Sequence, residues 1–139
     1  MKRAVTMGVL IGILAVSLTG CGAAGTNSDP LDGTSWVLTA YRKSKPIAGT
    51  SITATFEDGR VYGSSGCNTY NGSYQVRGNA ITVSDLAWTL MACLEPEGAM
   101  EQETLVIEFL SDAQTLRFVD GQLQIFQSDG EALTFTPGE

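Results

Sequence analysis

Three cysteines, Cys21, Cys67 and Cys93, carry the most reactive side chains of this chain. A thiol becomes a nucleophile when a neighbouring base takes its proton, and histidine is the commonest such base. The sequence contains no histidine. A reactive thiol would therefore lack its usual activator. A zinc site is also disfavoured, because Cys67 and Cys93 come without the spacing and the further ligands that zinc needs.

Two other patterns could suggest catalysis, and neither is convincing. Residues 63–66, Gly-Ser-Ser-Gly, lack the Gly-x-Ser-x-Gly spacing of a nucleophile elbow and fall in a predicted hairpin. Asp85 would have to pair with Glu95 or Glu97, and the spacing gives no sign of such a pair. No phosphate-binding glycine loop or calcium loop is present. We therefore expect no enzymatic activity, no catalytic residue, no metal and no cofactor.

The first twenty residues have the parts of a secretory signal, with Lys2 and Arg3 before an apolar run at 9–18. That run is too short for a stable membrane-spanning helix. Residues 18–21, Leu-Thr-Gly-Cys, resemble the bacterial lipobox, in which the cysteine receives a diacylglyceryl group before cleavage. We predict a signal peptide at 1–20 and lipidation of Cys21. The alternative is an ordinary secreted protein that is cut nearby and keeps Cys21 as a free thiol.

Residues 21–32 predict a flexible tether that follows the lipidated cysteine. They are mostly Gly, Ala, Thr, Asn, Ser, Asp and Pro, with no apolar anchor before Leu31. Several acyl chains on one residue hold a protein firmly at a membrane. We therefore expect a membrane-anchored protein on the extracytoplasmic side of the cell envelope. Gly22 follows Cys21 where an aspartate could stand, which favours the outer membrane in a Gram-negative cell.

Lipidation of Cys21 leaves two cysteines, and an exported chain meets an oxidising compartment. The favoured interpretation is a disulfide between Cys67 and Cys93. It would close a loop of about 26 residues and stabilise the fold by roughly 3 kcal/mol in the chain-entropy model. Two free structural thiols, or a reactive thiol, remain as alternatives.

The net charge of −7 argues against nucleic acid as a partner. Binding to phosphate backbones needs clustered lysine and arginine. The only basic cluster is Arg42, Lys43 and Lys45, which we interpret as part of a solvated loop. Loss of the signal peptide would remove Lys2 and Arg3 and make the balance still more negative.

Alternating apolar and polar residues predict an antiparallel sheet of about seven to eight strands. Asp-Gly pairs at 58–59, 120–121 and 129–130 separate alternating runs and favour tight hairpins, because both central residues adopt positive φ. Trp88 is expected to cap the core. The alternating runs are residues 34–41, 52–57, 61–65, 73–76, 80–83, 116–118, 123–125 and 133–135.

One helix is predicted near residues 97–111, with Pro96 in its first turn. Met100, Ile107 and Leu110 lie roughly on one face and should pack against the sheet. A partner-binding helix would have a similar pattern. The polar residues expected to face water are Glu101, Gln102, Glu103 and Glu108.

Four ordered motifs stand out along the chain. They are Gly-Cys-Asn-x-Tyr-x-Gly-x-Tyr at 66–74, Thr-x-Met-Ala-Cys at 89–93, Met-Glu-Gln-Glu at 100–103, and the Asp-Gly strand meander that ends the chain. Together they resemble the META domain, the domain of the HslJ-like heat-shock lipoproteins, and the resemblance covers residues 31 to 136.

The resemblance implies a single small α+β domain over residues 33–137, a curved antiparallel sheet with one packed helix. It also implies a link to heat stress, to drug tolerance and, in some parasites, to virulence. No catalytic activity is established for the family, so there are no catalytic residues to transfer. The best-matching residues form a candidate binding or structural motif: Asn68, Tyr70, Gly72 and Tyr74, beside the two cysteines.

The residues themselves favour structural roles for this motif and leave binding open. Asn68 suits a turn, because asparagine tolerates the left-handed conformation and can bond its own backbone; a polar contact in a groove is the alternative. Tyr70 and Tyr74 are expected to pack on the sheet, with a pocket lining as the alternative.

Three function classes follow from these observations. The favoured one is a non-enzymatic envelope lipoprotein with a stress-response or envelope-support role, whose domain binds a partner or a small apolar ligand between sheet and helix. The second is an interaction module, an inhibitor or assembly factor for another envelope protein. The third is an uncharacterised enzyme.

Overall fold

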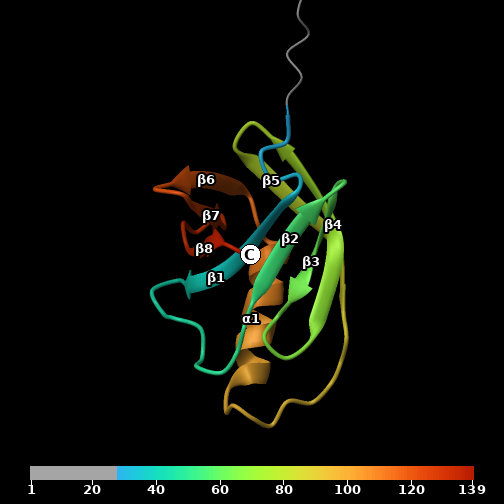
Figure 1. The fold of residues 1–139 in the computed structure, drawn as a ribbon, viewed down its shortest axis with the longest axis vertical. Helices are drawn as coiled ribbons and strands as arrows, with labels where there is room; N and C mark the ends of the chain where they lie inside the picture. The colour runs from blue at the N-terminus through green and yellow to red at the C-terminus, as the bar shows by residue number, and fades with distance from the viewer. Residues whose placement is uncertain (1–27) are drawn as a thin grey trace, which may run out of the picture.

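The computed structural model describes residues 28–139, whose strands form a closed antiparallel barrel with one helix (Figure 1). The predicted signal peptide, Cys21 and most of the tether lie outside the described residues. The elements are β1 Thr34–Tyr41, β2 Thr53–Glu57, β3 Arg60–Ser64, β4 Thr69–Arg77, β5 Ala80–Trp88, α1 Ala99–Ser111, β6 Thr115–Val119, β7 Gln122–Phe126 and β8 Ala132–Pro137.

The tight hairpins form where the Asp-Gly pairs predict them. Asp58 and Gly59 have φ of 49° and 73°, and Asp120 and Gly121 have φ of 50° and 77°, so both pairs adopt the backbone that two-residue hairpins need. The pair at 129–130 differs, because only Gly130 has positive φ there. A wider loop joins β7 to β8, closed by a hydrogen bond from Gln127 N to Glu131 O (3.0 Å).

The sheet closes into a barrel and is not the open curved sheet that the sequence predicts. β8 pairs with β1, with Leu38 opposite Phe135, and each strand also pairs with its neighbour along the chain. Closure removes the two exposed edges that an open sheet would leave. The domain is therefore mostly β, with eight strands and one helix among the described residues.

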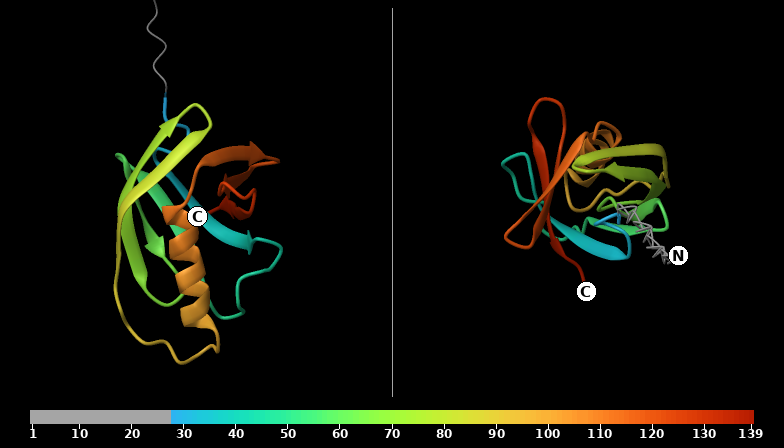
Figure 2. Two further views of the ribbon diagram at one scale, coloured as in Figure 1. Left: turned by 180° about the vertical axis from the view of Figure 1, so that it is seen from behind. Right: turned by 90° about the horizontal axis from the view of Figure 1, so that it is seen from above.

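The barrel is weakest between β5 and β6, where the helix is inserted in the chain. Only one residue pair, Ala80 with Thr115, joins these two strands in register. The rest of β5 runs away from β6 and continues to Trp88, well beyond the predicted run of 80–83. Helix α1 packs against β5, and Figure 2 shows it alongside the barrel on this side.

Apolar side chains fill the barrel. Leu31 is fully buried among them, so packing begins before residue 33, inside the segment that the sequence predicts as tether. The prediction that Trp88 caps the core is wrong, because Trp88 is 42% exposed at the end of β5. The largest fully buried apolar side chains are Phe56, Phe135, Leu31, Ile52, Ile81, Leu110, Leu123, Ile125, Leu133, Val61 and Val106.

Helix α1 begins two residues later than the prediction of 97–111 and ends where expected. Gly98, with φ of 86°, precedes its first residue, Ala99, so Pro96 lies before the helix and not in its first turn. Ile107 and Leu110 are buried against the barrel as predicted, together with Ala99 and Val106. The prediction for Met100 is wrong, because Met100 is 38% exposed. Among residues 28–139 no helix has the length and apolar character needed to cross a membrane.

Gly63 should be essential for the contact between β2 and β3. A methyl group there would lie 2.1 Å from the carbonyl oxygen of Thr53, which also accepts a hydrogen bond from the Tyr70 hydroxyl (2.8 Å). We expect Gly63→Ala to lower the free energy of unfolding by about 2–3 kcal/mol in urea titrations, because the backbone must move. Gly130→Ala is the control; it has open space and φ of 84°, so only about 1 kcal/mol should be lost. Equal small losses would contradict the steric argument.

Candidate functional site

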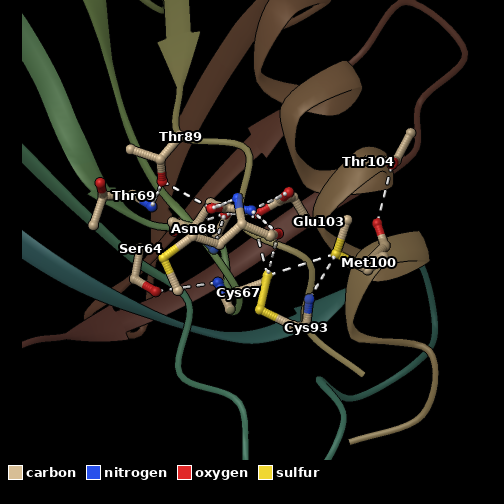
Figure 3. Close-up of a disulfide and its surroundings, with 12 residues drawn as sticks. Ser64, Cys67, Asn68, Thr69, Thr89, Cys93, Met100, Glu103 and Thr104 are labelled. Atoms are coloured by element: carbon tan, nitrogen blue, oxygen red, sulfur yellow. Dashed lines mark hydrogen bonds between the residues drawn. A yellow bond between two sulfur atoms is a disulfide. The ribbon is translucent and has the colours of Figure 1, made fainter. Parts of the chain in front are cut away.

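Asn68 is the centre of a buried polar cluster at the corner between β3 and β4 (Figure 3). Its side chain is 2% exposed. The amide oxygen accepts hydrogen bonds from Met91 N and from the Thr89 hydroxyl, both at 2.8 Å. The amide nitrogen donates to Met91 O (3.1 Å) and to Glu103 Oε1 (2.9 Å). Asn68 therefore binds both backbone groups of Met91, as a neighbouring strand would.

This arrangement differs from the turn that the sequence favours for Asn68. The residue with positive φ at this corner is Gly66, at 101°, and Asn68 is not among the non-glycine residues with positive φ. The Asn68 side chain instead reaches across to a segment more than twenty residues away in sequence. The reason is that the loop after β5 has backbone groups without sheet partners, and buried backbone groups require hydrogen bonds.

Glu103 accepts the remaining hydrogen bonds of this cluster, so the prediction that it faces water is wrong. Its side chain is 4% exposed. The carboxylate accepts from Asn68 N (2.9 Å), from Asn68 Nδ2 (2.9 Å) and from the Ser65 hydroxyl. Helical spacing could have revealed this, because Glu103 lies four residues after Ala99 and three or four before Val106 and Ile107, all buried.

Gln102 is the second polar residue that the sequence places in water and the structure buries, at 2% exposure. Its side-chain oxygen accepts from Ile47 N (2.7 Å), and its side-chain nitrogen donates to the Thr50 hydroxyl (2.9 Å). Two adjacent helix residues thus fix two different loops. Gln102 holds the loop between β1 and β2, and Glu103 holds the β3–β4 corner.

Cys67 and Cys93 are brought together as a disulfide, with Cα atoms 5.9 Å apart. The bond joins the β3–β4 corner to the loop that leads into α1 (Figure 3). Met100 lies beside it, with its sulfur 3.6 Å from Cys67 Sγ and accepting a hydrogen bond from Cys93 N (3.3 Å). The loop is therefore fixed twice, by the disulfide at Cys93 and by Asn68 at Met91.

The other candidate residues, Tyr70, Gly72 and Tyr74, lie along β4 and serve the barrel. Burial raises the pKa of Tyr70, whose hydroxyl donates to Thr53 O (2.8 Å). A methyl group on Gly72 would lie 2.8 Å from the carbonyl oxygen of Ser84, so β4 and β5 pack closely there. Tyr74 meets the ring of Phe56 edge-on, with centroids 4.9 Å apart. The three residues therefore do not join Asn68 in one site.

The arrangement is suited to holding a loop and offers little for chemistry. The Asn68 amide and the Glu103 carboxylate are buried and hydrogen-bonded. Within residues 28–139, no group of three or more acidic, histidine or cysteine side chains is placed to hold a metal ion. What the cluster does present to solvent is the loop itself, which carries Leu90 and Leu94 with 86% and 85% of their surfaces exposed.

Replacing the Glu103 carboxylate by an amide should damage the fold. In Glu103→Gln the side-chain NH₂ group must face at least one of the three donors that the carboxylate accepts. We expect the free energy of unfolding to fall by about 2 kcal/mol in urea titrations. The Met91 amide, bonded through Asn68, should also exchange its hydrogen faster. Glu101→Gln, exposed on the same helix, is the control and should change stability by less than about 0.5 kcal/mol. A Glu103 variant as stable as this control would contradict the role given to the carboxylate.

Alkaline pH should destabilise the barrel through two buried tyrosines. Burial raises the pKa of Tyr70 and Tyr74 above the ordinary 10.0, and for Tyr74 the Asp29 carboxylate adds to the effect. In the unfolded chain both tyrosines ionise near pH 10, whereas in the folded chain they stay neutral. Their contribution to the free energy of unfolding is therefore full below pH 10 and falls as the pH rises above it. Tyrosinate absorbance should show their ionisation only as the protein unfolds, and Tyr70→Phe should make the fall shallower. Ionisation of every tyrosine near pH 10 in the folded protein would contradict this.

Comparison with known proteins agrees with this description. The family model of the META domain matches residues 29–139. No curated protein matches the chain. Among solved structures, an NMR structure of a protein from Burkholderia xenovorans is 30% identical, with a TM-score of 0.65, and covers 78% of this chain and 83% of its own. A second NMR structure is 24% identical with a TM-score of 0.62, covering 76% of this chain and 90% of that one.

A further similar structure widens the range of sequences that share this fold. A crystal structure of a DUF4847 family protein from Bacteroides vulgatus is 16% identical, with a TM-score of 0.58, and covers 77% of this chain and 94% of its own. At such identity only the fold is shared. The family match from residue 29 also agrees with the burial of Leu31, since both place the start of the domain before β1. Because the family model matches residues 29–139, the chain belongs to the META domain family.

Proposed function

We propose that this chain is a non-enzymatic lipoprotein of the bacterial cell envelope, held through a lipid on Cys21 on the extracytoplasmic side of a membrane. In a Gram-negative cell that membrane is the outer membrane. The META domain acts by contact with a partner protein, in a stress-response or envelope-support role. The lipobox-like residues 18–21 support the anchor, and the domain's surface supports the mode of action.

The observation that carries the proposal is how the domain uses its buried polar groups. Asn68 and Glu103 are buried and bonded to each other, and Asn68 holds the backbone of Met91. The loop fixed in this way presents Leu90 and Leu94 to solvent almost completely. Exposed apolar side chains gathered on one segment are typical of interaction sites. The domain therefore offers its surroundings an apolar surface and not a reactive group.

The position of the loop also favours contact with a partner. Figures 1 and 2 place the β5–α1 loop at one end of the domain and the start of the described chain, drawn in blue, at the other. An anchor that precedes residue 28 leaves this loop on the side away from the attachment point. A rigid loop in that position is accessible to other proteins of the envelope.

A small apolar ligand inside the domain receives less support. Phe56, Phe135, Ile125 and other fully buried side chains occupy the barrel. The hollow next to the loop, lined by Trp88, Thr104 and Ile107 among others, has a volume of about 160 Å³, which suits one side chain better than a lipid. A larger pocket of about 520 Å³ lies between α1, the end of β1 and the β7–β8 loop, but charged residues such as Arg42 and Asp112 line it and disfavour an apolar guest. We therefore favour a protein partner over a bound lipid or drug.

Complementation of a strain that lacks this protein tests the proposal. Growth under heat and under a hydrophobic antibiotic should be restored by the unaltered chain. Restoration should fail for Cys21→Ser, which cannot be lipidated, and for the double variant Leu90→Asp and Leu94→Asp, whose domain should remain folded because both side chains are exposed. Mass spectrometry of the protein from membranes should find acyl chains on the peptide that begins at Cys21.

Val119→Asp is the matched control, because Val119 is an exposed apolar residue in the β6–β7 hairpin, away from the loop. It should complement like the unaltered chain. Full complementation by the folded Leu90 and Leu94 double variant would overturn the proposed mode of action. An unlipidated protein in the cytosol would overturn the proposed location.

A further inference from the structure

Four side chains form what we name the apolar loop surface: Leu90, Met91, Leu94 and Met100. They come from the β5–α1 loop and the first turn of α1. Leu90 and Leu94 are almost fully exposed, Met91 is 65% exposed and Met100 is 38% exposed. The fold does not need these surfaces for its core, which is complete without them. A surface of this kind needs an explanation outside the folding of the domain.

The apolar loop surface is held rigidly in place by buried contacts. Asn68 bonds both the N–H and the C=O of Met91, and the disulfide fixes Cys93 one residue before Leu94. Cys93 N also donates to the sulfur of Met100, which ties the loop to α1. Binding through a segment that is already ordered loses less conformational entropy than binding through a mobile loop. The anchoring therefore suits recognition of a partner.

A shallow groove continues the surface along the helix. It is lined by Trp88, Thr104, Ile107, Glu103 and Glu108 and has a volume of about 160 Å³. Met100, Thr104 and Glu108 are four residues apart, so the groove lies on the same side of α1 as Met100. Trp88 immediately precedes the loop and is 42% exposed. The groove therefore adjoins the apolar loop surface through Trp88, which leads into the loop, and through Met100, one turn of α1 before Thr104.

Carboxylates surround this site. Glu95 and Glu97 follow Leu94 in the loop, Glu101 follows Met100, and Glu108 lines the groove; all four are exposed. The chain as a whole also carries a net charge of −7. Like charges disfavour a second copy of this chain and an anionic lipid surface, whereas lysine or arginine in a partner would be attracted. Charge complementarity therefore selects among the possible occupants.

We propose that this site binds a protein segment in which apolar residues are flanked by lysine or arginine, such as one face of a basic amphipathic helix. One apolar side chain of the segment enters the groove between Trp88 and Ile107. Its neighbours contact Leu90, Met91 and Leu94, and its basic residues approach the surrounding carboxylates. This inference rests on the proposed function, because it names the class of partner that the contact requires. It follows the recognition of amphipathic helices by apolar sites.

Site-specific photo-crosslinking in living cells tests the inference on the full chain. A benzoylphenylalanine residue replaces Leu94, and in a control it replaces Phe118, an exposed residue of β6. After irradiation we expect one crosslinked protein with the probe at 94 that is absent with the probe at 118. Peptide mass spectrometry should place the crosslink in a segment of the partner that has apolar residues next to lysine or arginine.

Charge reversal distinguishes specific binding from accidental proximity, because only specific binding should make the crosslinking yield depend on the carboxylates near the probe. With the probe at 94, the double variant Glu97→Lys and Glu101→Lys should lower the crosslinking yield at least fivefold. Glu131→Lys with Glu139→Lys, in the β7–β8 loop and at the last residue, gives the same change in net charge away from the site and should leave the yield unchanged. Equal losses in both variants would show a general charge effect and would overturn the inference.

Three other outcomes would also overturn it. These are a crosslink to a second copy of this chain, a crosslink to lipid, and a crosslink in a partner segment without basic residues. In each of these cases the proposed function is judged separately by the complementation assay with the Leu90 and Leu94 double variant. If that variant fails to complement while the crosslink is one of these three kinds, the loop is needed for function but its partner is not a basic segment.

Discussion

The pairing of Asn68 with Glu103 is the interaction on which the rest of the structure depends. A buried carboxylate and a buried amide each need several partners, because an unsatisfied polar group in the interior costs about 1–3 kcal/mol. Their partners come from the β3–β4 corner, the loop after β5 and helix α1. The cluster is satisfied only when these three segments meet in one arrangement. It therefore determines how the helix docks on the barrel as well as where the loop runs.

The disulfide and the polar cluster fix different degrees of freedom of the same loop. A bond between Cys67 and Cys93 limits how far the loop can move from the corner but allows it to rotate. The two hydrogen bonds between Asn68 and the backbone of Met91 fix its orientation. Gln102 does the same for the β1–β2 loop on the other side of the helix. Helix α1 thus organises one end of the barrel through two adjacent polar residues.

Local patterns in the sequence predicted the local structure well. Asp-Gly at 58–59 and at 120–121 specifies its own backbone, so the hairpins and most strands could be placed from neighbouring residues alone. Closure of the barrel could not be predicted in this way, because the pairing of Leu38 with Phe135 joins residues that are far apart in the chain. Trp88 was misplaced for a similar reason, since the path of β5 depends on where α1 packs.

The same limit explains why the candidate site was only partly recognised. Asn68 and the two cysteines stood out by their residue types, but Glu103 on a predicted helix has the appearance of a solvated charge. Its burial depends on donors supplied by Ser65 and Asn68, more than thirty residues earlier. A charged residue is buried only when such donors meet it, and the pattern of a single segment does not show which distant residues supply them. The mismatch between its charge and its position on the apolar helix face was the available signal.

The loop after β5 separates the groups that hold the fold from the groups that face solvent. The backbone of Met91 and the sulfur of Cys93 make the structural contacts, whereas the side chains of Leu90 and Leu94 point into solvent. Substitutions at the exposed positions leave the polar cluster intact, because none of its hydrogen bonds uses those side chains. The fold and the exposed apolar surface are therefore specified by different atoms of the same loop. A scaffold with this property can keep its architecture while the chemistry of the surface that it presents is altered.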